Sequence, residues 1–205
     1  MTTGLSPRRA AKRAHISDAA RKLFLAQGFA TTSMDAVTAE AAVSKQTLYA
    51  YFPTKIDPLA DVLYNGISGL VLDPLDLDQL RTAADLRHGL IEFSVRLTGN
   101  LLQPEAIALV RLVLGEVFHV EELRNAFREA LPGQVLARTE RLLRHSAEVG
   151  LIHLEDADLS ARMFVGSMMT YVALDGFLSA EPIGPPPRAE LEKLVDIFLA
   201  TVALP

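Results

Sequence analysis

A polar surface able to form hydrogen bonds with another molecule is predicted around Gln46. If this stretch is helical, Leu48 and Phe52 share a buried face because they are four residues apart. Gln46, Thr47 and Ala50 then point outward. An amide can donate to and accept from adenine, a threonine can meet a base edge or the methyl group of thymine, and an alanine lets the backbone approach closely. The pattern therefore favours contact with the bases of double-stranded DNA.

Basic and aromatic side chains around this surface suit phosphate groups. Lys45, Tyr49 and Lys55 are placed to meet phosphate oxygens, which set the register of a duplex but carry no sequence information. Two of them have ordinary alternatives, because Tyr49 can pack at a helix junction and Lys45 can simply be solvated. A further basic cluster, interpreted either as a charged helix start or as an arm for the minor groove, comprises Arg8, Arg9, Lys12 and Arg13.

Short helices joined by a tight turn are predicted to position these residues. A first helix covers residues 8–27, with one apolar face. The capping pattern Thr-Ser-Met-Asp at 32–35 begins a second helix, and a turn follows at 41–43. Ser44 can cap a third helix, which ends before Pro53. The second and third helices have the dimensions of a helix-turn-helix, whose second helix enters the major groove.

The charge is distributed unevenly along the chain. The net charge is −5, yet residues 1–60 hold eight Lys and Arg against four Asp and Glu, a net +4, which leaves −9 for the rest. A basic N-terminal part joined to an acidic remainder indicates that the first part meets a polyanion. A solvated surface of mixed sign is the alternative.

The amino-acid sequence of the N-terminal segment also resembles that of a known family. The stretch GFATTSMDAVTAEAAVSKQTLYAYFPTK, with the preceding AARKLFLAQ, resembles the N-terminal signature of the TetR family of tetracycline-repressor-like regulators. The match covers residues 12–63, and its most specific part is Leu-Tyr-x-x-Phe-x-x-Lys at 48–55 after Val-Ser. The resemblance implies a three-helix DNA-binding domain, with a fourth helix leading to an all-helical domain for ligand binding and dimerisation.

Functional positions carry over by this resemblance. The family usually has glycine where Ala42 stands, and a negative φ at this residue would make the difference unimportant. The operator sequence cannot be derived, because family members read different operators. By this resemblance, Thr32 and Lys55 match phosphate-contacting sites. The residues that match DNA contacts are Thr32, Ser44, Lys45, Gln46, Thr47, Tyr49, Tyr51 and Lys55.

The fold expected for the whole chain is all-α. Residues 8–53 are expected to form the helix-turn-helix domain, and residues 54–205 the ligand-binding and dimerisation domain, with a connecting helix over 54–71. A proline-rich linker is expected at 181–187. The remaining helices are predicted at 79–102, 104–117, 121–148 with a kink or break at Pro132, 156–179 and 188–203.

Two broad apolar helix faces near the C-terminus are expected to form a homodimer interface. Two subunits about 34–36 Å apart along DNA are the usual route to specificity for a helix of this size. In a monomer the same residues would be core. The residues expected at the interface are Phe164, Val165, Val172, Leu191, Leu194, Val195, Phe198 and Val202.

A small hydrophobic or aromatic effector is expected in the helical C-terminal part. Large and adaptable side chains there could line a cavity, although they could equally form ordinary core. No metal or cofactor is expected, because His119, His145 and His153 lack metal-ligand spacing. The candidate ligand-binding residues are Phe93, Leu97, Leu101, Phe118, Phe127, Met163, Met168 and Tyr171.

The sequence favours a cytoplasmic, ligand-responsive regulator over other classes. The family resemblance implies a repressor, and an activator is the alternative. Cysteine is absent, which fits a reducing compartment, and charges interrupt the apolar runs that a signal peptide or membrane span would need. An enzyme is disfavoured because no nucleophile elbow, phosphate loop or His-Glu-x-x-His motif is present. A helical interaction protein that binds no DNA is the other alternative.

Overall fold

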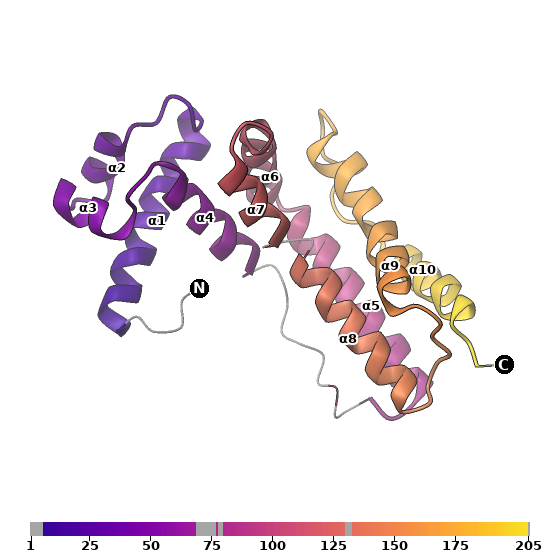
Figure 1. The fold of residues 1–205 in the computed structure, drawn as a ribbon. Coiled ribbons are helices and arrows are strands. Elements are labelled where there is room, and N and C mark those ends of the chain that lie inside the picture. The colour runs from indigo at the N-terminus through magenta and orange to yellow at the C-terminus, as the bar shows by residue number, and fades with distance from the viewer. Residues whose placement is uncertain (1–5, 69–76, 78–79, 130–132, 205) are drawn as a thin grey trace. The chain divides into compact units, whose positions relative to one another are not determined.

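The structure is a computed structural model that describes residues 6–68, 77, 80–129 and 133–204, and the elements in these ranges are helical without a strand (Figure 1). The expected all-α fold is therefore confirmed for the described chain. The chain divides into two compact units, one formed by residues 1–67 and 108–130 and the other by 68–107 and 131–205. The expected domain boundary after residue 53 stays a prediction.

The first unit contains the N-terminal helices. These are α1 (Pro7–Gln27), α2 (Met34–Glu40), α3 (Lys45–Tyr51) and α4 (Ile56–Ser68), together with α7 (Glu121–Arg128) and most of α6 (Pro104–Val117). The apolar stripes of α1, α3 and α4 form a core in which Ile16, Phe24, Leu48, Phe52 and Leu63 have no exposed surface. The short helices α2 and α3 depend on this burial, because isolated helices of seven residues are unstable in water.

The second unit consists of α5 (Ala83–Leu101), α8 (Gln134–Glu148), α9 (Ala157–Tyr171), the π-helical turn η3 (Val172–Phe177) and α10 (Arg188–Thr201). A capping box between Thr82 and Asp85 begins α5. Tilted aromatic rings in contact join α5, α9 and α10, since the centres of Phe93 and Phe164 are 6.1 Å apart and those of Phe164 and Phe198 are 4.9 Å apart.

Two of the predicted long helices are interrupted. The one over 121–148 is divided into α7 and α8, with Pro132 outside the described residues. The one over 156–179 continues from α9 into η3, where the wider turn brings Gly176 against Leu102. Residues 181–187 form no helix, as predicted, whereas the connecting segment after Ser68 lies outside the described residues except Leu77.

The expected interface residues are part of the protomer core, which corrects the prediction from the apolar faces. Helix α9 packs mainly against α8, and α10 packs mainly against α5, so the most apolar side chains of both helices are used within the chain. Only Leu194 remains partly accessible. The buried residues are Phe164, Val165, Val172, Leu191, Val195, Phe198 and Val202.

No single helix among the described residues is long and apolar enough to cross a membrane. Helices α5 and α6 have the length and apolar composition of a membrane span only when they are taken together, and they are bent by 69° at the break between them.

Candidate nucleic-acid interface

Side-chain caps begin both helices of the predicted helix-turn-helix. The hydroxyl of Ser33 accepts a hydrogen bond from the backbone N–H of Ala36, and that of Ser44 accepts one from the N–H of Thr47, both at 3.1 Å. Each cap satisfies one of the N–H groups that a helix start leaves without a partner. The starts of α2 and α3 are therefore defined by local chemistry. Ser44 caps α3 as predicted, whereas α2 is capped by Ser33, one residue after the first residue of the predicted capping pattern.

The turn between α2 and α3 has the geometry of a Schellman motif. The N–H of Val43 donates to the carbonyl of Thr38 at 3.2 Å, and the N–H of Ala42 donates to that of Ala39 at 3.1 Å. Ala42 lies between them with φ of +49°, in the left-handed region. The condition of a negative φ, under which alanine in place of glycine would be unimportant, is therefore not met, because closing this motif requires a left-handed residue at this position.

The outward face of α3 has the composition that the sequence predicted. Leu48 and Phe52 are fully buried beneath it, whereas Gln46 is exposed and Tyr49 is 46% exposed. Thr47 is partly exposed, and its hydroxyl is hydrogen-bonded to that of Ser44 at 2.8 Å. A donor and acceptor pair at Gln46 is thus free to approach a base edge, while Thr47 is oriented by the cap.

Lys45 shares this face with an acidic neighbour from α2. Its Nζ atom lies 2.7 Å from the carboxylate of Asp35. The hydrogen bond and charge of Asp35 raise the pKa of Lys45, so the side chain is a cation throughout the neutral range. Both side chains are mostly exposed, and the pair can exchange for a phosphate contact at little cost.

Two expected phosphate contacts have structural partners instead. Thr32 is only 2% exposed, and its hydroxyl donates to the carbonyl of Gly28 at 2.8 Å and accepts from the amide of Gln27 at 3.1 Å. The Thr32 side chain therefore stabilises the end of α1 and does not face a duplex, which corrects that expectation. Lys55 donates to the carbonyl of Ala30 at 3.0 Å, and partial burial lowers its pKa.

A basic hollow next to α3 is the feature that the sequence did not reveal. The sequence shows the basic cluster at the start of α1. It does not show that residues of α3 lie opposite this cluster, because that depends on how the two helices cross. The hollow has a volume of about 590 Å³ and is lined by Ser6, Arg8, Arg9, Ala11, Lys12, His15, Thr47 and Tyr51. Tyr51 is half-buried there, with the guanidinium carbon of Arg9 5.8 Å from the centre of its ring.

The candidate ligand residues are distributed over both units. Phe118 is 73% exposed and belongs, with the half-buried Phe127, to the first unit, so Phe118 does not line an enclosed site. This corrects the expectation for Phe118, which follows the end of α6 and has no apolar layer over it. In the second unit, Phe93, Leu97, Leu101 and Met168 are buried in the core.

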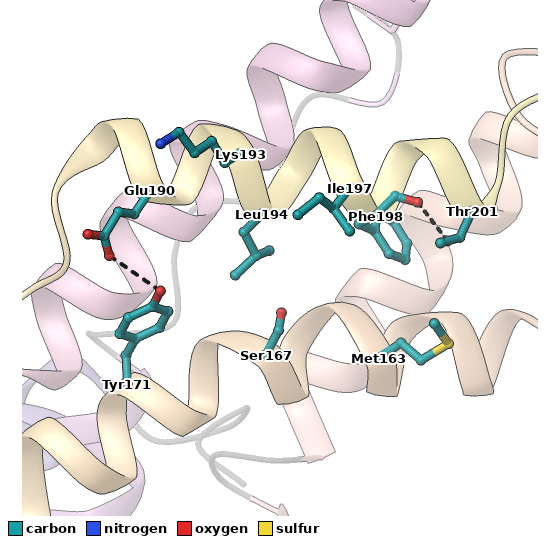
Figure 2. Close-up of a pocket in the computed structure, with 9 residues that line it drawn as sticks. All are labelled: Met163, Ser167, Tyr171, Glu190, Lys193, Leu194, Ile197, Phe198 and Thr201. Carbon is teal, nitrogen blue, oxygen red and sulfur yellow. Dashed lines mark hydrogen bonds between the residues drawn. The ribbon is translucent and has the colours of Figure 1, made fainter.

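Met163 and Tyr171 line an open hollow of about 470 Å³ between α9 and α10. Figure 2 shows side chains from the two helices facing each other across it, with the hydroxyl of Tyr171 donating to Glu190 at 3.4 Å. The remaining lining residues are the apolar Leu194, Ile197 and Phe198 and the polar Ser167, Lys193 and Thr201. Among the described residues, no group of three metal-ligating side chains is close enough to hold a metal ion.

Comparisons with known proteins identify similar domains and folds. A family model described as bacterial regulatory proteins, tetR family, matches residues 16–57, and one described as the C-terminal domain of AefR-like transcriptional repressors matches residues 88–202. No curated protein sequence matches the chain significantly.

Several solved structures share the fold over nearly the whole chain. A protein described as a TetR-family transcriptional regulator from Mesorhizobium loti is 25% identical, with a TM-score of 0.78, over 97% of this chain and 100% of that one. The flavonoid-responsive regulator FrrA is 25% identical, with a TM-score of 0.75, over 95% and 98% of the two chains. A TetR transcriptional regulator from Agrobacterium tumefaciens, 24% identical over 97% and 95%, has a TM-score of 0.74.

Proposed function

Because the chain belongs to the tetR family of bacterial regulatory proteins, we propose that this transcriptional regulator is a repressor that binds a palindromic DNA operator as a homodimer. A small hydrophobic or aromatic effector releases it. The observation that carries the DNA-binding part is the exposed Gln46 and Thr47 above the buried Leu48 and Phe52. If α3 only packed within a core, the side-chain amide of Gln46 would be buried as well.

Gln46 is the residue proposed to read a base. Replacing Gln46 with alanine should cost about 1–3 kcal/mol of binding free energy on the preferred operator if the amide forms two hydrogen bonds with one base. The preference should relax at one position of each half-site, while affinity for unrelated duplexes stays the same.

The measurement is selection of bound fragments from random duplexes by the wild type, followed by titration of single-base variants of the selected site. Lys22→Ala, at an exposed cation of α1 that is not on the outward face of α3, is the matched control. An equal loss on every sequence after Gln46→Ala would assign Gln46 to the backbone and refute base reading.

The homodimer is proposed to form through the outer face of α9 and α10. Leu159, Met163 and Ile197 are 55%, 51% and 70% exposed there, and they continue the apolar lining of the hollow between the two helices. A second copy of the same face would remove these side chains from water. Two recognition helices could then occupy major grooves one helical turn apart.

Ile197→Glu tests this interface. A charge in the apolar face should shift the chain from dimer to monomer, measured by analytical ultracentrifugation, and should weaken operator binding. Ile183→Glu is the control, because Ile183 is 81% exposed in the linker before α10. An unchanged dimer after Ile197→Glu would place the interface elsewhere.

The effector is proposed to act by changing the spacing of the two DNA-binding units. A compound that binds better when the recognition helices no longer match successive grooves must weaken DNA binding, typically by about 1–3 kcal/mol of coupling. Similarity to a flavonoid-responsive regulator supports an aromatic compound. A panel of aromatic and aliphatic compounds added to the selected protein–DNA complex should identify members that dissociate it, and no response across the panel would count against this chemistry.

A further inference from the structure

The hollow of about 470 Å³ between α9 and α10 has the volume of a small-molecule site, since such sites measure about 300–1,000 Å³. Helix α9 packs mainly on α8 and α10 mainly on α5, so the side chains between α9 and α10 do not fill this space. Met163, Leu194 and Phe198 form its apolar walls (Figure 2). A thioether and a phenyl ring are favourable neighbours of a flat aromatic ring.

Two hydroxyl groups that line this hollow have already used their protons. Ser167 donates to the carbonyl of Phe164 at 2.6 Å, and Thr201 donates to that of Phe198 at 2.7 Å. A hydroxyl that donates one hydrogen bond keeps its two lone pairs as acceptors. Figure 2 shows the oxygen of Ser167 pointing toward α10. Both groups can therefore accept a hydrogen bond from a molecule in the hollow.

One end of the hollow adds a charged acceptor. The hydroxyl of Tyr171 donates to the carboxylate of Glu190 at 3.4 Å, a long hydrogen bond that leaves the carboxylate able to accept others. Among the described residues that line the hollow, Lys193 is the only cation, and it forms no ion pair. A nearby cation lowers the pKa of a bound hydroxyl group, which favours a phenol over an aliphatic alcohol.

A second copy of this face would cover the hollow without matching its acceptors. In a two-fold dimer the same surface lies on both sides of the interface, so acceptors of one copy face acceptors of the other. The exposed side chains of Leu159, Met163 and Ile197 are apolar. Because burying an acceptor without a donor is unfavourable, the covered hollow requires a further molecule that brings donors.

We propose that this hollow binds an aromatic compound with hydroxyl groups and that a second copy of the chain covers its open side. The aromatic body lies against the apolar walls, and its hydroxyl groups donate to Ser167, Thr201 and Glu190. This inference rests on the proposed function, because it requires the homodimer and gives the effector a site. Since the compound contacts both copies, its binding and dimerisation strengthen each other.

Calorimetric titration of the full chain with dihydroxybiphenyl tests the chemistry of the ligand. Dimethoxybiphenyl is the matched compound, because it has the same rings but no hydrogen-bond donor. It should bind about 5–100-fold more weakly, since two hydrogen bonds are lost. Equal affinities for the two compounds would overturn the proposal.

Two matched threonine variants test the position of the site. Thr201→Val removes one acceptor but keeps the shape of the side chain, so it should weaken dihydroxybiphenyl binding about 2–10-fold and leave dimethoxybiphenyl binding unchanged. Thr170→Val is the control, because Thr170 also donates to a carbonyl three residues earlier but does not line the hollow. Ser167→Leu fills the hollow and should abolish binding of both compounds. Equal effects of the two threonine variants, or binding that survives Ser167→Leu in a folded protein, would overturn the proposal.

Sedimentation equilibrium tests whether the second copy covers the site. Saturating dihydroxybiphenyl should lower the dimer dissociation constant of the wild type but not that of Ser167→Leu, and dissociation of the dimer by the compound would overturn the proposal. A wild type that forms a dimer and binds a selected duplex, but takes up no dihydroxybiphenyl, overturns this inference alone. A wild type that stays monomeric overturns the proposed homodimer as well.

Discussion

Replacing Ala42 with glycine should stabilise the protein, although it removes a side chain from a turn next to the DNA-binding face. Ala42 has φ of +49° at the end of α2, where the two hydrogen bonds of the Schellman motif close the turn. A Cβ atom in this left-handed conformation crowds the following carbonyl, and glycine has no Cβ.

The magnitude follows from two opposing terms. The left-handed conformation costs a non-glycine residue about 1–2 kcal/mol, whereas glycine loses about 0.4–1 kcal/mol more conformational entropy on folding. The net gain for Ala42→Gly is about 0.5–1 kcal/mol. For a chain of this length, that corresponds to a rise in the melting temperature of about 1–4 °C.

Thermal unfolding of the full chain, followed by circular dichroism, measures the effect. Ala39→Gly, in the last turn of the same helix at a residue with helical conformation, is the control and should lower stability by up to about 1 kcal/mol. The selected operator should bind Ala42→Gly as tightly as the wild type, because the turn is unchanged. A lower melting temperature for Ala42→Gly would show that Ala42 is not strained, and it would refute the reasoning from the left-handed turn.

Two further predictions concern the second unit. A Cβ atom on Gly176 would lie 2.6 Å from the side chain of Leu102, so Gly176→Ala should lower the free energy of unfolding by about 1–3 kcal/mol in urea titration. Gly99→Ala, where the space is open, should not, and equal effects would contradict the packing argument. The guanidinium of Arg87 lowers the pKa of Asp196, so this ion pair stabilises the fold above the usual aspartate value of 3.8 and is lost as the pH falls below it. Asp196→Asn should therefore flatten the decline in melting temperature in acid, and an unchanged decline would exclude the pair as its source.

The recognition helix was predictable because its determinants are local. The cap at Ser44, the buried pair Leu48 and Phe52, and the proline after them all lie within one segment, and the structure places the helix at Lys45–Tyr51. Its outward face follows from helical geometry alone. The contact of Gln46 with a base stays a prediction.

The role of Thr32 and the C-terminal interface were not predictable, because they depend on which neighbours arrive from elsewhere in the fold. Thr32 was expected to face a phosphate, yet the end of α1 supplies both of its hydrogen-bond partners. Val195 and Phe198 were expected at a homodimer interface, with the protomer core as the alternative, and α5 and α9 cover the face that carries them. Periodicity shows that a face is apolar, but it does not show whether the same chain or a second copy covers it.

The ion pair at the centre of the first unit limits how the recognition helix can respond to a signal. Arg13 of α1 pairs with the buried Asp61 of α4, and its guanidinium carbon lies 4.7 Å from the centre of the Phe52 ring at the end of α3. A rotation of α4 would therefore either carry α1 and α3 along as one block or separate two charges, one of them shielded from solvent. Because separation is unfavourable, we expect a signal that reaches α4 to reorient the whole DNA-binding unit and leave its internal geometry unchanged.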